Sequence, residues 1–193
     1  VAPFARGTTY FKGKTVDSAD LPGPSVLGQV HVFQDTDPSD ETKHRSNGDV
    51  TAIAVRNVSG ISLVPKRLVV FKTDAIGKEV DGYCSTYSQL CAGVVDDHLP
   101  AAGCPDDDIC WIIVKGPCLV TSSVPSITLA AAVNDPVHAK TAASSTAASN
   151  IAGGRWVRNA AAAATGASAL LVNHNRIGFA MTARTADNTD SDT

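Results

Sequence analysis

The chain has 193 residues and a formal net charge of −3, and these values already exclude several classes of protein. The length suffices for one substantial domain with an appendage. With 16 basic residues against 19 acidic ones, there is no electrostatic reason to expect a nucleic-acid partner. No window approaches the ~18 apolar residues that a membrane-spanning helix needs, and Val1–Arg6 lacks the apolar core of a signal peptide. We therefore expect neither a membrane partner nor secretion.

The composition indicates the fold class. Aromatic residues make up 5% of the chain and charged residues 18%, while alanine, valine, serine and threonine dominate. Thin layers of small and β-branched side chains suit strands better than a large helical core. The sequence therefore predicts a mainly β fold, with a β-barrel or β-sandwich body.

Residues 1–48 differ from the rest because glycine and proline interrupt them too often for a long regular element. We expect an extended, largely irregular N-terminal arm, in which residues 26–33 could form a single strand. Such an arm buries little of itself, so its aromatic residues Phe4, Tyr10 and Phe11 must be ordered by another surface. That surface is either the body of the protein or a partner.

A β-rich body is expected over residues 49–185. Alternation over 50–58, 61–64 and 68–71 favours a meander, and residues 83–95 supply one or two irregular strands. The unbroken apolar run 109–114 is typical of a strand that is covered on both faces. Lys115-Gly116-Pro117 then interrupts the pattern, which resumes at once, so we expect two strands joined by a tight corner or one long strand with a bulge.

The later segments are shorter and weaker in pattern. We expect strands at 127–133, 155–157, 168–172 and 177–184. The low-complexity stretch 139–150 has no apolar stripe at helical spacing, so a loop or an assembly-dependent arm is expected there. Residues 186–193 read as a polar C-terminal tail.

Five cysteines lie between Cys84 and Cys118, and none has the spacing of a zinc ribbon. Buried thiols in a reducing compartment are the favoured interpretation. A local disulfide, Cys84–Cys91 or Cys104–Cys110, is the alternative.

One stretch contains residue types used in catalysis. A thiol, imidazole and carboxylate site could be drawn from Asp96, Asp97, His98, Cys104 and Cys110. The favoured interpretation is an exposed acidic loop beside buried cysteines, with His98, like the other histidines, on the surface or in a loop. The acidic segment 35–41 lacks the glycine and glutamate of a calcium loop, so we expect a solvated loop. We thus predict no catalytic residues, no cofactor and no metal site.

The order of segments resembles the head decoration, or cement, proteins of tailed bacteriophages. The resemblance lies in Cys91-Ala92-Gly93-Val94-Val95, the strand Trp111 to Pro117, the glycine-rich segment reaching Trp156-Val157, and Arg176-Ile177-Gly178-Phe179-Ala180-Met181. It covers roughly residues 85–185 at the level of pattern, and the N-terminal arm in character only.

The resemblance implies a structural virion protein, made in the host cytoplasm, that is not an enzyme. Such a protein binds the outer surface of the phage head as a homotrimer and stabilises contacts between major capsid subunits. Phe4, Tyr10 and Phe11 are then candidates for capsid contact. Two alternatives remain: another virion component (fibre, tail or head–neck) or a carbohydrate-binding β module, and, less favoured, a cysteine-dependent hydrolase that uses Cys104 or Cys110.

Overall fold

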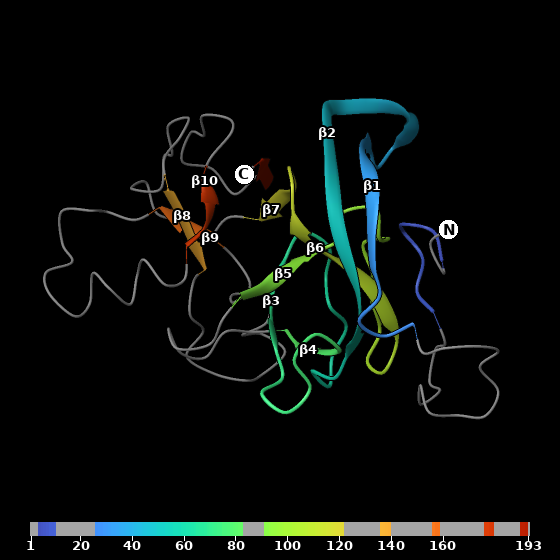
Figure 1. Ribbon diagram of the computed structural model, residues 1–193, viewed down its shortest axis with the longest axis vertical. Coiled ribbons are helices and arrows are strands. Elements are labelled where there is room, and N and C mark those ends of the chain that lie inside the picture. Colours follow the sequence, from blue (N-terminus) through green and yellow to red (C-terminus); the bar gives the residue numbers. More distant parts are fainter. Residues whose placement is uncertain are drawn as a thin grey trace, which may run out of the picture.

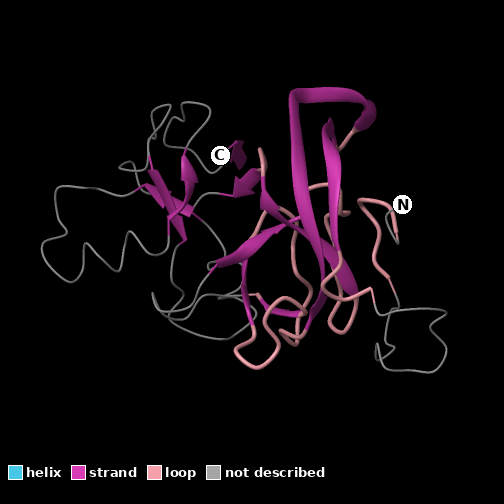
Figure 2. Ribbon diagram, viewed as in Figure 1, coloured by secondary structure: helices cyan, strands magenta, loops and turns pink. Residues whose placement is uncertain are grey.

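The computed structural model describes residues 4–10, 26–82, 91–121, 136–139, 156–158, 176–179 and 190–192. Every regular element in these ranges is a β-strand (Figure 2). The predicted mainly β fold is therefore confirmed. Among the described residues, no helix is long and apolar enough to cross a membrane.

Eleven strands are found in the described ranges. They are β1 (Val30–Asp37), β2 (Asp40–Asn57), β3 (Leu68–Phe71), β4 (Glu79–Asp81), β5 (Cys91–Val95), β6 (Ile109–Lys115), β7 (Leu119–Thr121), β8 (Pro136–Ala139), β9 (Trp156–Arg158), β10 (Arg176–Phe179) and β11 (Asp190–Asp192). Strands β1–β6 form one six-stranded sheet, β8–β10 a three-stranded sheet, and β7 pairs with β11. Figure 1 shows these groups.

Within the large sheet the pairings form a closed circuit of five strands. β2 pairs in parallel with β4, β4 with β3, β3 with β5, β5 with β6, and β6 returns to β2. The expected meander is therefore wrong, because β4 lies between β2 and β3. Residues 61–64 form no strand and contribute only the isolated bridge between Leu63 and Cys104, so β3 does not return beside β2 as a hairpin.

The boundary expected between residues 48 and 49 is also wrong, because β2 runs through it. β1 and the first half of β2 pair as an antiparallel ribbon that projects beyond the rest of the sheet (Figure 1). The projecting part is polar, and its strands are joined by backbone pairing and by hydrogen bonds from Arg45 and Ser46 to Asp35. Both β1 and the whole of β2 therefore belong to the sheet, including the part of β2 that precedes residue 49.

One apolar cluster lies where the five strands of the circuit face one another. Its members are Val55, Leu63, Val69, Val80, Ala92, Val95, Leu99, Cys104, Cys110 and Ile112. Alternation along a strand sends Cys110 and Ile112 of β6 toward this cluster and their neighbours Ile109 and Trp111 to the opposite face. All four are at most 1% exposed, so the prediction that β6 is covered on both faces is confirmed.

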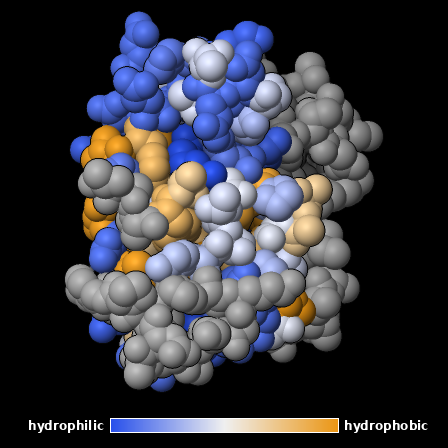
Figure 3. Space-filling view, turned by 90° about the vertical axis from the view of Figure 1, so that its right-hand side faces the viewer, coloured by the Kyte–Doolittle hydropathy of each residue, from blue (hydrophilic) through white to orange (hydrophobic). Residues whose placement is uncertain are grey.

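A second apolar cluster covers that opposite face. It contains Val26, Ala52, Ala54, Ile109 and Trp111, with Phe4, Tyr10, Leu27 and Phe33 packed against it. The space-filling view in Figure 3 shows apolar atoms gathered below the hydrophilic end of the molecule. Within the described residues 4–10, Phe4 and Tyr10 thus pack on the body.

Several predictions concern the later segments. β9 matches the expected strand at 155–157, and β10 overlaps the one at 177–184. The tail expected at 186–193 includes β11, which pairs with β7. The strands expected at 127–133 and 168–172 lie outside the described residues, as does nearly all of the stretch 139–150.

Candidate functional site

The best-defined interaction site is the place where residues Phe4–Tyr10, here called the docking segment, meet β6. β5 pairs with β6 only as far as Val95, opposite Ile112, which leaves the rest of that β6 edge without a strand. Tyr10 fills the position: its N–H donates to the Ile109 carbonyl at 2.9 Å, and the Ile109 N–H donates to the Tyr10 carbonyl at 3.1 Å. The segment therefore satisfies backbone groups that would otherwise be buried without partners.

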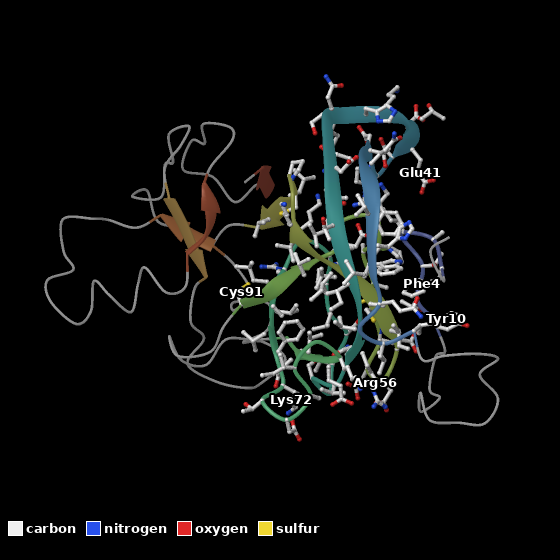
Figure 4. All side chains as sticks on the ribbon, viewed as in Figure 1. Phe4, Tyr10, Glu41, Arg56, Lys72 and Cys91 are labelled. Carbon is white, nitrogen blue, oxygen red and sulfur yellow. The ribbon has the colours of Figure 1, made fainter. Side chains whose placement is uncertain are left out.

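Aromatic contacts fix the segment above the face of β6. The ring of Phe4 stacks on Trp111 at a centroid distance of 4.7 Å and on Tyr10 at 5.4 Å. Trp111 Nε1 donates to the Phe4 carbonyl at 3.2 Å, so the buried indole keeps a hydrogen-bond partner. Phe33 of β1 meets Trp111 edge-on at 5.3 Å. Figure 4 shows the labelled Phe4 and Tyr10 close together on the β1 side.

Gly7 allows the segment to approach the body closely. Its φ of +76° lies in the left-handed region, which side chains other than glycine rarely adopt. A Cβ atom at this position would stand 2.6 Å from the carbonyl oxygen of His98. Both the turn and the close approach therefore require glycine.

Beside Gly7, a network of buried charges joins the segment to two other parts of the chain. Arg6 donates from Nη2 to Asp96 Oδ1 at 2.8 Å and to Asp97 Oδ1 at 3.2 Å. Arg45 of β2 donates to Asp97 Oδ2 at 2.6 Å and to Asp35 Oδ1 of β1 at 2.7 Å. We call Arg6, Asp35, Arg45, Asp96, Asp97 and His98 the charge network.

His98 completes the charge balance of this network. Its Nδ1 lies 2.9 Å from Asp97 Oδ1 and 3.3 Å from Asp96 Oδ1, and its side chain is 2% exposed. Burial opposes the charge on the imidazole, but the hydrogen bonds to Asp96 and Asp97 outweigh it and raise the pKa of His98 to about 9. Burial likewise opposes ionisation of Asp96, but hydrogen bonds from His98 and Arg6 hold its pKa at about 2. Three carboxylates thus face two guanidinium groups and one imidazolium at neutral pH.

Among the described residues, Asp96, Asp97 and His98 are the one group whose ligand atoms could together hold a metal ion, lying within 4.8 Å of one another. The same oxygens already accept hydrogen bonds from Arg6, and the His98 imidazole is protonated. A metal ligand must offer a free lone pair, so a cation would have to displace Arg6 and deprotonate His98. The residues fit an internal ion-pair network better than a metal site.

The two cysteines of the hydrolase alternative form a separate buried pair. Cys104 and Cys110 are thiols with 0% exposure. A hydrogen bond with Cys104, together with burial, raises the pKa of the Cys110 thiol well above its usual range. A nucleophilic cysteine requires the opposite shift. For these two residues the expectation of buried thiols is confirmed, and Cys84 lies outside the described residues.

The sequence-predicted site residues have different outcomes. Phe4 and Tyr10 lie against the protein's own body, which is one of the two surfaces expected to order them, while Phe11 lies outside the described residues. His98 lies in a turn, which fits the expected surface or loop position, but the loop expected to be exposed is buried here: Asp96 and Asp97 are 1% and 5% exposed. Asp35 was assigned to a solvated loop, but it is 2% exposed and paired with Arg45.

Arg6 is the functional residue that sequence reasoning missed. It contacts a carboxylate 90 residues away, and no local pattern announces such a pairing. The sequence offers one weak indication: Arg6 is the one charged side chain in the segment 4–10, where it follows Phe4 and precedes Gly7. Models of known protein families include none that matches this chain, and a search of curated proteins finds no match either.

Proposed function

We propose that this chain is a structural virion protein, a capsid decoration or cement protein that binds the outer surface of a tailed-phage head. In this role it stabilises contacts between major capsid subunits and acts without a cofactor. The observation that carries the proposal is the order of strand segments that resembles decoration proteins. Three of those segments lie in β5, β6 and β10, and a fourth in β9.

The docking segment supports the same role. A short N-terminal piece that adds backbone pairing and aromatic anchors to a sheet is a general mode of attachment between proteins. Here the piece lies on its own body, with Phe4 and Tyr10 partly buried. The capsid contacts proposed for Phe4, Tyr10 and Phe11 require these side chains, or others of the arm, to engage the shell when the protein binds.

The free edge of β1 offers a further surface for assembly. Within the described residues β1 pairs with β2 alone. Val30 and Val32 are 60% and 53% exposed on one face of this strand. An edge strand with exposed valines invites pairing unless a neighbour covers it, which fits a protein that works in contact with other subunits. Those subunits are the major capsid protein and other copies of this chain in a homotrimer.

Electron microscopy of virions of the phage that encodes this chain tests the proposal. Gold-labelled antibody against the chain should decorate the whole head surface. Labelling confined to the tail, fibres or neck would replace the proposal with another virion component. A virion without label would contradict every virion role and return attention to a carbohydrate-binding module.

A binding experiment tests the part played by the arm. Purified chain lacking residues 1–20 is mixed with mature heads and compared with the complete chain by co-sedimentation. We expect weaker binding of the truncated chain. Binding of equal strength would remove the arm from the capsid contact.

A further inference from the structure

We propose that the site on β6 is an exchange site: when copies of this chain assemble, the docking segment of one copy occupies β6 of a neighbouring copy. This inference deepens the homotrimer of the proposed function. It can be tested in solution without a capsid, so its failure and the failure of the capsid role are distinguishable.

The contacts of the docking segment do not depend on which copy supplies it. The Tyr10–Ile109 backbone pair, the Phe4–Trp111 stack and the Arg6–Asp96 ion pair all join the segment to the body. The same segment delivered by a second copy would make the same contacts. Exchange of an identical element therefore loses no interaction, which is why it is a low-cost route to assembly.

The connection to the body is long enough for exchange. Tyr10 and Val26 belong to the same apolar cluster, so the connection over residues 11–25 joins two neighbouring points when it closes on its own body. Those 15 residues could span up to about 50 Å when fully extended. A neighbouring body within that reach is accessible to the segment.

The local concentration of neighbouring copies decides whether the segment binds its own body or that of a neighbour. A tether of 15 residues keeps the segment near its own body at an effective concentration of about 1 mM. In a dilute, roughly micromolar solution the segment therefore closes on its own copy. Inside an assembly, neighbouring bodies lie at a comparable local concentration, and the exchanged arrangement adds a link between copies.

Charge complementarity favours this chain's own segment over a foreign strand. Without Arg6, the carboxylates of Asp35, Asp96 and Asp97 face only Arg45 and His98, which leaves one buried negative charge unbalanced. An occupant must bring one cation to that position, beside an aromatic side chain that stacks on Trp111. Residues 4–10 of a second copy supply both.

The test is a photo-cross-linking experiment with two isotopic forms of the full chain. A ¹⁵N-labelled copy carrying Phe4→p-benzoylphenylalanine is mixed in equal amount with unlabelled chain. The mixture is unfolded, refolded and concentrated until it assembles. After irradiation, mass spectrometry identifies the peptides joined to position 4. With exchange in the assembly, roughly half of the links to the β6 peptide should join a heavy segment to a light body.

Matched controls are available from two glycines. Gly7→Ala should abolish links of both kinds, because its Cβ would collide with His98, whereas Gly60→Ala, with a φ of +77° and open space around it, should leave them unchanged. Dilution before irradiation should convert mixed links into links within one copy. Two results would overturn the proposal: links within one copy alone at every concentration, or a chain that stays monomeric when concentrated.

Discussion

The two faces of β6 are buried to the same extent but by different means. The inner face, with Cys110 and Ile112, is covered by apolar side chains from the other strands of the circuit. The outer face, with Ile109 and Trp111, is covered by side chains around β1 and by Phe4 and Tyr10 of the docking segment, which lies beside a network of buried charges. The inner face is built by the strands of the circuit themselves, whereas the outer face also depends on a short segment that joins β6 through one backbone pair, one aromatic stack and an ion pair.

The largest expected effect comes from breaking the inner face. Ile112→Ala removes a fully buried side chain from the central cluster and should lower the free energy of unfolding by about 2–5 kcal/mol. Chemical denaturation of the full chain measures this. A loss below about 1 kcal/mol would mean that the site collapses to fill the space, and that the cluster is not the tight core described above.

A smaller and more local effect is expected at Gly7. Gly7→Ala and Gly60→Ala both place a side chain in the left-handed region, at a cost of about 1–2 kcal/mol each. Only at Gly7 does the new Cβ also meet the body. We expect Gly7→Ala to release the docking segment, so that trypsin cleaves after the otherwise buried Arg6 about tenfold faster or more.

The comparison with Gly60→Ala isolates the contact with the body. Gly60→Ala should leave cleavage after Arg6 at the rate of the unchanged chain. Equal rates in all three proteins would show that the segment is not held by the approach of Gly7 to His98.

A pH dependence of stability should follow from the charge network beside the outer face. The pKa of His98 is raised from 6.5 to about 9, so its contribution to stability is fully present below pH 6.5 and is lost as the pH rises through 9. The pKa of Asp96 is lowered from 3.8 to about 2, so its contribution is present above pH 3.8 and is lost as the pH falls through 2.

His98→Gln provides the control for this dependence. The difference in melting temperature between the unchanged chain and His98→Gln should be largest near pH 6 and should shrink toward pH 10. A difference that stays constant over this range would show that His98 contributes by packing and not by its charge.

The smallest effect is expected on the exposed face of β1. Val32 is 53% exposed, so Val32→Thr in the isolated chain should change stability by less than about 0.5 kcal/mol. The same substitution should weaken assembly if this edge is covered by a neighbour. Thermal unfolding of dilute protein and sedimentation of concentrated protein separate the two.

Sequence reasoning succeeded where burial imposes a local pattern. The apolar run 109–114 and the segment 68–71 were correctly predicted as strands, β6 and β3, because a buried strand has a continuous run of apolar side chains. The β1–β2 ribbon was missed in part because Asp40–Gly48 is polar and its pairing needs only backbone groups. The position of β4 between β2 and β3 was missed because its three residues carry too short a pattern to read.

The candidate site could be predicted only in pieces. The sequence singled out Asp96, Asp97 and His98 by their density, and Phe4 and Tyr10 as aromatic residues in need of a surface. Arg6 joins these pieces, and its partner Asp96 lies 90 residues further along the chain. Contacts of this kind follow from the fold and not from spacing. The same reason explains why the loop that carries Asp96 and His98 was expected to be exposed, whereas both side chains are buried.

The central claim is that the docking segment is part of the sheet, and hydrogen exchange at Ile109 tests it most directly. The Ile109 N–H donates to Tyr10, whereas the register of β6 on β2 directs the next amide, that of Cys110, toward Val55. In the full chain both amides should be protected. In a chain lacking residues 1–10, we predict fast exchange at Ile109 and continued protection at Cys110. Fast exchange at Ile109 in the full chain, or unchanged protection after truncation, would contradict the account.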